Sequence, residues 1–86
     1  MEYKVYILWS VSIERFYVGS TNDLADRLHR HNAGEGKYTK KGIPWRLIWN
    51  GSCADRSEAV RLENKIKKRG IKRFLLDREI NTEPEE

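Results

Sequence analysis

The chain has 86 residues, a formal net charge of +4 and charged residues at 35% of its positions, a composition typical of one small folded domain. Its longest apolar run, residues 5–9, is far shorter than the about 20 residues of a membrane-spanning helix. The first residues lack the basic and apolar regions of a signal peptide, and the lone Cys53 excludes an internal disulfide, so we expect a cytoplasmic protein with no membrane partner.

The charge is unevenly distributed along the chain. Four of the 13 acidic residues lie in 79–86, so residues 1–78 alone carry a net charge of +8. A small basic body of this kind favours polyanionic partners such as nucleic acid. We expect one domain over 1–80, followed by an acidic, disordered tail over 81–86.

The first half of the chain predicts two strands and a helix. Residues 3–9 are aromatic, aliphatic and β-branched with one polar interruption, which indicates a central strand buried on both faces. The polar stretch 10–15 is typical of a hairpin loop, and strand character returns over 16–19. The capping residues of 20–23 then introduce a helix that runs to about Asn32.

The second half predicts a basic loop over 35–44, a third strand over 45–49 and two helices. A capping box at 55–58 opens the first of these helices, which Gly70 ends, and the second covers 72–80. The alternation of the third strand sets three residues on one face against two on the other: Trp45, Leu47 and Trp49 against Arg46 and Ile48. The expected fold is α+β, a small three-stranded antiparallel sheet with flanking helices in the order β-β-α-β-α-α.

Two charged side chains lie at the edges of the predicted buried helix faces. Arg27 is three residues from Leu24, and Glu63 is three residues from Ile66. An ionised carboxylate at such an edge needs a cation, a set of donors or a metal ion. An Arg27–Glu63 ion pair that joins the two helices is the structural alternative to a functional role.

Two tyrosines occupy adjacent predicted strands. Tyr6 lies in 3–9 and Tyr17 in 16–19, and antiparallel pairing would bring their phenol groups within reach of each other. Tyrosine in a strand is ordinarily a packing residue, so neither position is diagnostic alone. Gly19 follows, and it either serves the turn or lets a ligand approach the backbone closely.

Taken in chain order, these residues resemble the GIY-YIG nuclease domain. The resemblance is carried by five elements: Lys4-Val5-Tyr6, Tyr17-Val18-Gly19, Leu24-Ala25-Asp26-Arg27-Leu28, His31 and Glu63. No single triplet is specific, but the ordered set with its spacing is. The resemblance implies the fold described above and hydrolysis of phosphodiester bonds.

The resemblance covers residues 3 to about 75 and is greatest to the short standalone bacterial members, through the 37–39 loop and the Lys-rich segment 65–69. Lys4 replaces the Gly of the first triplet. Ser20 stands where many family nucleases carry a Lys, and the Asn that often follows the metal-binding Glu has no counterpart. A catalytically weak or inactive nucleic-acid-binding module is therefore the alternative to an enzyme.

The resemblance implies an endonuclease that cuts DNA with one Mg²⁺ or Mn²⁺ ion, in repair or in processing of branched or damaged strands. Glu63 would hold the ion, and Arg27 would contact the scissile phosphate. Tyr6 or Tyr17 would orient the attacking water and take its proton, and His31 would assist as base or proton relay. Which of the three takes the proton stays open.

Basic residues of the loop and the last two helices would bind the nucleic acid. Residues 61–78 carry a net charge of +6, although a solvated helix face is the alternative for 72–78. The candidate nucleic-acid-binding residues are Gly19, Lys37, Tyr38, Lys40, Lys41, Lys65, Lys67, Lys68 and Arg69. DNA is the expected substrate, with RNA not excluded. At this size we expect a homodimer or a protein partner to supply specificity.

Three other interpretations are weaker. A structural adaptor would expose the apolar residues of 74–76 and use the acidic tail. A zinc pair of His29 and His31 would need side chains that helical spacing turns apart. Cys53 lacks a cationic cluster beside it in the sequence, which favours a small buried side chain.

Overall fold

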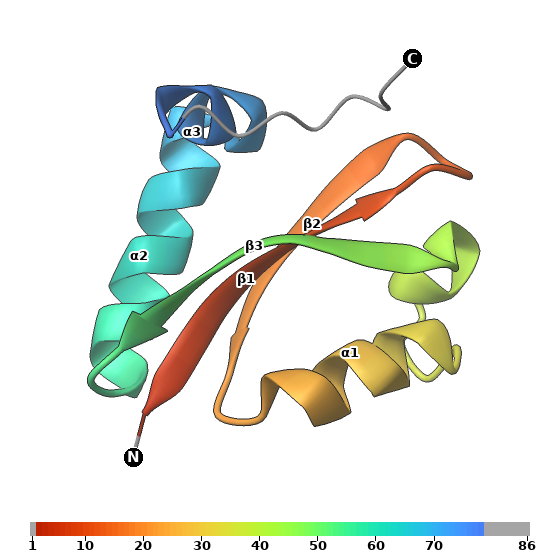
Figure 1. Cartoon of the computed structure of the whole chain (residues 1–86), viewed down its shortest axis with the longest axis horizontal. Helices are drawn as coiled ribbons and strands as arrows, with labels where there is room; N and C mark the ends of the chain where they lie inside the picture. The colour runs from red at the N-terminus through yellow and green to blue at the C-terminus, as the bar shows by residue number, and fades with distance from the viewer. Residues whose placement is uncertain (1, 79–86) are drawn as a thin grey trace.

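The structure is a computed structural model, and it describes residues 2–78. Its elements in chain order are β1 (Tyr3–Ser10), β2 (Arg15–Thr21), α1 (Leu24–Asn32), the 3₁₀ helix η1 (Thr39–Gly42), β3 (Trp45–Cys53), α2 (Arg56–Arg69) and α3 (Ile71–Asp77). This order confirms the predicted α+β fold, with η1 added inside the expected basic loop (Figure 1). The predicted tail at 81–86 and the end of the last predicted helix at 79–80 lie outside the described residues.

The sheet is antiparallel in the order β2-β1-β3. β1 is the central strand because its residues are apolar on both faces, and the side chains from Val5 to Leu8 are buried. β2 and β3 form the two edges. The prediction of a central first strand joined to the second by a hairpin is therefore confirmed.

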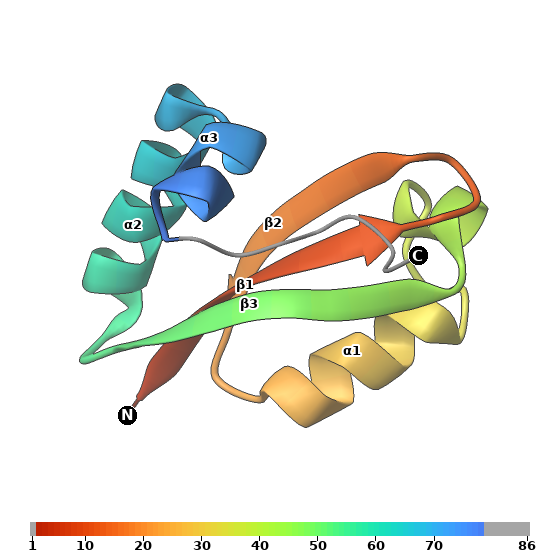
Figure 2. The same ribbon diagram turned by 45° about the horizontal axis from the view of Figure 1, so that its top comes forward.

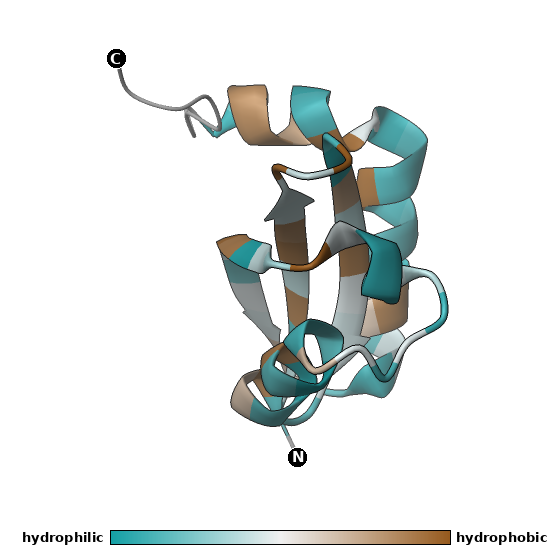
Figure 3. Cartoon of the chain, turned by 90° about the vertical axis from the view of Figure 1, so that its right-hand side faces the viewer, coloured by the Kyte–Doolittle hydropathy of each residue, from teal (hydrophilic) through white to brown (hydrophobic). Residues whose placement is uncertain are grey.

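Each face of the sheet carries its own apolar cluster. Val5 and Ile7 of β1 face the cluster that buries α2 and α3, whereas Tyr6 and Leu8 face the cluster that buries the apolar side of α1. Figure 2 shows α1 on one side of the sheet and α2 with α3 on the other. The hydrophobic segments of the strands lie between these layers, and the outer helix faces are hydrophilic (Figure 3).

β3 contains a β-bulge, which changes the face of the sheet on which some of its side chains lie. Opposite Ile7 and Leu8 of β1 the pairing jumps from Trp49 to Leu47, which leaves Ile48 as the extra residue. Leu47 packs in the α1-side cluster, but Trp49 packs with Ile48 in the α2-side cluster. The prediction that Trp49 shares a face with Leu47 is wrong because strict alternation does not continue through a bulge.

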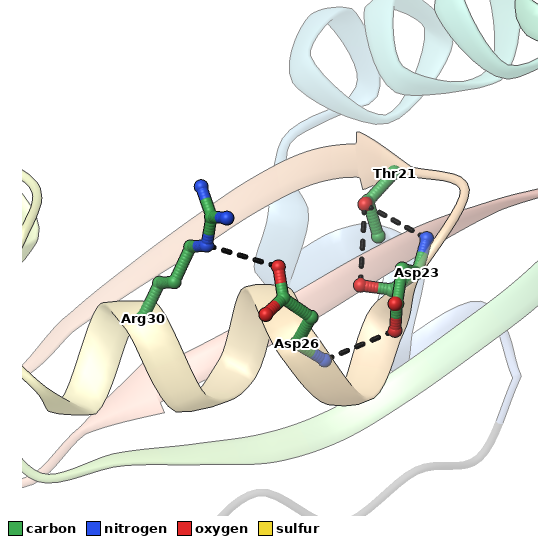
Figure 4. A network of polar contacts seen from close by, with 4 residues as sticks. All are labelled: Thr21, Asp23, Asp26 and Arg30. Carbon is green, nitrogen blue, oxygen red and sulfur yellow. Dashed lines mark hydrogen bonds and ion pairs between the residues drawn. The ribbon is translucent and has the colours of Figure 1, made fainter.

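A set of polar contacts fixes the connection from β2 to α1. The Asp23 carboxylate caps α1 by accepting a hydrogen bond from the Asp26 backbone N–H at 3.1 Å, and the Thr21 hydroxyl accepts one from the Asp23 N–H at 3.0 Å. Asp26 also pairs with Arg30 one turn on, at 2.9 Å (Figure 4). These contacts hold the first turn of α1, from which Arg27 projects.

The apolar residues of the last helix belong mostly to the core. Phe74 and Leu75 are buried and Leu76 is 62% exposed. The adaptor interpretation needs all three residues on the surface, so the structure does not support it. No helix within residues 2–78 combines the length and the apolar character that crossing a membrane requires.

Candidate active site

A buried chain of polar side chains crosses the α1 side of the sheet. The Tyr6 hydroxyl of β1 lies 2.9 Å from Nε2 of His31 on α1. Nδ1 of the same imidazole lies 3.1 Å from the Thr39 hydroxyl of η1. The indole N–H of Trp45 donates to the Thr39 carbonyl at 2.6 Å, which fixes η1 against β3. Within the described part of the chain, no buried side-chain nitrogen or oxygen lacks a partner.

The surroundings of Tyr6 and His31 set their protonation. Burial, and next the charge of Arg27, lower the pKa of His31, so the imidazole is neutral near pH 7. Burial, and next the neighbouring Tyr17, raise the pKa of Tyr6, which keeps its phenol protonated although Arg27 acts the other way. A protonated Tyr6 can donate to Nε2 of a neutral His31 whose Nδ1–H donates to Thr39.

Aromatic rings surround this polar chain. The half-buried Tyr17 ring has its centroid 6.2 Å from that of Tyr6 and 4.9 Å from that of His31. Tyr38, which is 58% exposed, lies beyond it, with 6.1 Å between the centroids of Tyr17 and Tyr38. The structure thus brings together the two strand tyrosines, the histidine of the helix and the tyrosine of the basic loop.

Gly19 makes room for the Tyr6 ring. The two residues are directly paired across β1 and β2, and a Cβ at Gly19 would lie 2.7 Å from the Tyr6 hydroxyl oxygen and 3.1 Å from the Tyr17 ring. Contact distances below 3.0 Å are essentially never seen for a Cβ atom. Packing therefore accounts for this glycine, and ligand contact at Gly19 stays a proposal.

Glu63 lies on α2 in a hollow that it shares with Tyr17, Tyr38 and Lys67. Its side chain is 20% exposed, and its Oε2 pairs with Nζ of Lys67 at 2.8 Å, one helical turn away. No ion pair joins Glu63 to Arg27 in residues 2–78, so the interpretation of these two residues as a bridge between helices is wrong.

Arg27 lies on the other side of the tyrosines, on the exposed surface of α1. It lines a hollow with Arg30, His31, Glu35 and Gly36, and its charge acts on the imidazole of His31. Among the described residues it forms no ion pair and no side-chain hydrogen bond, which leaves its donors available to a ligand.

The donor set suits a hard ion held through few protein ligands. The described residues contain no group of three or more His, Cys, Asp and Glu side chains that could hold a metal. His29 is exposed whereas His31 is buried and bound to Tyr6, so the two do not form a zinc pair. Glu63 offers a single carboxylate, and Mg²⁺ commonly retains several waters on one or two carboxylates.

The predicted nucleic-acid-binding cations spread over two regions. Every candidate except Gly19 is exposed: Lys37, Tyr38, Lys40 and Lys41 around η1, and Lys65, Lys67, Lys68 and Arg69 on α2. Lys67 alone among the α2 candidates shares the Glu63 hollow in the described structure. Arg69 instead donates two hydrogen bonds to Asp77 of α3, at 3.0 and 3.1 Å.

A sequence model of the GIY-YIG catalytic domain matches residues 2–73. The chain belongs to the GIY-YIG family. Its predicted membership is thereby confirmed, and the family points to a nuclease-type protein with a nucleic-acid substrate.

Relatives within the GIY-YIG family include short proteins named UPF0213. A UPF0213 protein of Lacticaseibacillus paracasei is 43% identical over 49 residues, which are 56% of this chain and 55% of that protein. One of Haloquadratum walsbyi is 45% identical over 65 residues, 73% of this chain and 71% of that protein. The match thus spans little more than half the length of the first of these relatives.

A solved structure supports the fold of this GIY-YIG chain. The solution structure of the UPF0213 protein BH0048 from Bacillus halodurans aligns with a TM-score of 0.59 and 30% sequence identity. The alignment covers 95% of this chain and 89% of that one. The strand and helix order described above therefore matches a UPF0213 protein of known structure.

Two residues to which the sequence analysis assigned no role in the site support it in the structure. Thr39 binds His31, and the Asn32 side chain donates to the Trp45 carbonyl at 3.1 Å and accepts from the Trp45 N–H at 2.6 Å. Thr39 belongs to the 37–39 loop that contributes to the resemblance, but that loop has no helical or strand period that would indicate a contact with His31. Asn32 follows His31 directly, but a helix C-terminus explains an Asn there equally well.

Proposed function

We propose that this chain is a metal-dependent endonuclease that hydrolyses phosphodiester bonds of DNA, in repair or processing of branched or damaged strands. The observation that carries the proposal is the buried Tyr6–His31–Thr39 chain. Its His31 lines the hollow of Arg27, and Tyr17, whose ring centroid is 4.9 Å from that of His31, lines the hollow of Glu63. Burying three polar side chains costs free energy that apolar residues of similar size would not cost. A proton-transfer role gives this arrangement a function.

The attacking water gives its proton to the oxygen of Tyr17, which lines the Glu63 hollow, as the Tyr17 proton passes to the Tyr6 oxygen and the Tyr6 proton passes to Nε2 of His31. This step needs a neutral imidazole, and the lowered pKa of His31 supplies one near pH 7. Tyr17, at the edge of the Glu63 hollow, orients the water. The new oxygen–phosphorus bond forms as the bond to the leaving oxygen breaks, and that oxygen takes a proton from solvent.

Glu63 and Arg27 manage the charge of the phosphate. Glu63 would hold one Mg²⁺ or Mn²⁺ ion, which when bound neutralises charge on the phosphate and on the leaving oxygen. The planar guanidinium of Arg27 contacts two oxygens of the scissile phosphate, a geometry that a lysine cannot reproduce. Lys67 pairs with the Glu63 carboxylate at 2.8 Å and so orients it.

The surface beside the site binds the rest of the nucleic acid. Lys37, Lys40 and Lys41 surround the exposed Tyr38, whose ring continues from Tyr17 at 6.1 Å between centroids. Cations contact backbone phosphates and an aromatic face stacks on a base without reading its identity. We therefore propose binding without sequence specificity, with a second copy or a protein partner adding selectivity.

The test is a cleavage assay on plasmid, single-stranded and branched DNA, with RNA alongside, in Mg²⁺ or Mn²⁺. Wild type is compared with Arg27→Ala and Glu63→Ala, and folding of each is checked by circular dichroism. We expect both variants to lose more than about a hundredfold in rate, or roughly 2.7 kcal/mol of transition-state stabilisation. Equal binding by all three chains and cleavage by none would contradict the proposal and favour a binding module.

A further inference from the structure

A further hollow lies at the end of the sheet where β1 begins and β2 ends. Its lining residues are Tyr3, Ser20, Thr21, Asn22, Arg27 and Arg56. Two of these residues are arginines and none of them is acidic. Neither Arg27 nor Arg56 forms an ion pair with any residue of 2–78. Two like charges facing one hollow repel each other, and an anion between them would remove that cost.

The place of Arg56 on its helix gives no stabilising reason for a cation. Arg56 is the first residue of α2, directly after the N-cap Asp55. The N-terminus of a helix carries partial positive charge, so acidic residues stabilise the first turn and basic residues weaken it. Arg56 is exposed and has no acidic partner in the described structure that offsets this effect.

Arg56 also lies in line with Glu63. Seven residues separate them on α2, so they share one face of the helix and are about 10 Å apart along its axis. Figure 1 shows the first turns of α1 and α2 at the same end of the sheet. Arg27 lines both this hollow and the hollow of His31, so it lies between the two.

We propose that Arg56, together with Arg27, binds a second phosphate of the nucleic-acid strand, beside the phosphate that is cut. This inference rests on the proposed nucleic-acid substrate. The half-buried Ser20 hydroxyl lines the same hollow and donates to the phosphate, whereas the Thr21 hydroxyl is already engaged with Asp23. One strand of B-DNA rises about 3.4 Å per nucleotide, so 10 Å places the second phosphate about three nucleotides or fewer from the first.

The test is metal-free binding, which needs no cleavage. Fluorescence anisotropy measures the affinity of wild type, Arg56→Ala and Arg56→Lys for a labelled 20-nucleotide DNA, single-stranded and duplex, between about 50 and 200 mM salt. The matched control is Arg46→Ala, which removes one exposed arginine. Arg46 pairs with Trp9 at the other end of β1, about 20 Å from Tyr3.

We expect Arg56→Ala to weaken binding about three- to tenfold and to flatten the plot of log affinity against log salt by about 0.7 to 0.9. Arg56→Lys should recover most of the slope, and Arg46→Ala should match wild type. The thermal midpoint of Arg56→Ala should stay level or rise, a result that a purely structural role would reverse. In a cleaving wild type, Arg56→Ala should raise KM and leave kcat within about twofold.

Two outcomes overturn the inference. In the first, Arg56→Ala binds with the same affinity and the same salt dependence as Arg46→Ala. In the second, wild type binds neither the single-stranded nor the duplex DNA. Cleavage assays on the same preparations separate this inference from the proposed function. If wild type does not cut but Arg56→Ala loses affinity and slope, the nuclease proposal fails and the phosphate site stands. If wild type cuts and Arg56→Ala behaves as the control, the phosphate site fails alone.

Discussion

Gly19→Ala tests the geometry of the site through one added carbon. The new Cβ would lie 2.7 Å from the Tyr6 hydroxyl oxygen, and ordinary contacts begin at 3.4 Å, so the phenol must move by about 0.7 Å. Tyr6 is 1% exposed and its hydroxyl is held 2.9 Å from His31, so the movement strains a packed ring and a buried hydrogen bond. Overpacking of this kind costs about 1–3 kcal/mol, and the weakened hydrogen bond adds about 1 kcal/mol.

Urea unfolding followed by circular dichroism measures the cost. Together these terms amount to about 2–4 kcal/mol, so with a slope of about 1 kcal/mol per molar urea the midpoint of Gly19→Ala should fall by about 2–4 M. Tyr6→Phe removes the oxygen at 2.7 Å and leaves a nearest ring carbon at 3.0 Å, so Gly19→Ala should cost less in that background. We expect the double variant to lose at least about 1 kcal/mol less free energy of unfolding than the two single variants lose together. Additivity within about 0.5 kcal/mol would refute the close packing of Tyr6 on Gly19.

Three further outcomes are expected. The free energy of unfolding of wild type should fall as pH drops below about 6.5, because the unfolded chain protonates His31 at its ordinary pKa while burial keeps the folded imidazole neutral to lower pH. Urea titrations at pH 7.0 and 5.5 measure this loss, which His31→Gln should reduce and His29→Gln should leave unchanged. An unchanged loss in His31→Gln would contradict the buried neutral imidazole. Asn32→Ala should cost about 1–3 kcal/mol in the same unfolding assay, because it strips both backbone groups of Trp45 of their side-chain partner, and a loss below about 0.5 kcal/mol would argue against that contact. Burial raises the pKa of the Cys53 thiol, so a thiol reagent should label it only after denaturation, and rapid labelling of the folded chain would contradict its burial.

The strands and helices could be predicted because their signals are local. The apolar run of 3–9 requires a strand buried on both faces, and the capping residues before α1 and α2 mark where those helices begin. The bulge at Ile48 could not be predicted, because it depends on how β3 pairs with β1 over 40 residues away. For that reason Trp49 lies on the face opposite to the one that alternation indicates.

In the site, too, local sequence patterns indicated some residues, whereas others depend on contacts between distant parts of the chain. The order of Tyr6, Tyr17, Arg27, His31 and Glu63 indicated the family, and the structure brings the two tyrosines and the histidine together. Their partners depend on tertiary contacts. Thr39 and Arg56 meet the site through a loop and a helix end that no sequence period relates to it. Glu63 takes Lys67 as its ion-pair partner because residues four apart share a helix face, whereas Arg27 belongs to the other layer.

The nuclease proposal is tested most directly by the single-turnover rate of cleavage of supercoiled plasmid as Mg²⁺ is titrated, for wild type and Glu63→Gln. Glu58→Gln is the matched control, because it removes one carboxylate from the exposed first turn of the same helix. We expect the wild-type rate to rise and saturate with Mg²⁺, Glu58→Gln to follow it, and Glu63→Gln to fall more than about a hundredfold. Cleavage by Glu63→Gln at the wild-type rate, or no cleavage by any chain at any Mg²⁺ concentration, would contradict the assignment of Glu63 as the metal ligand of an endonuclease.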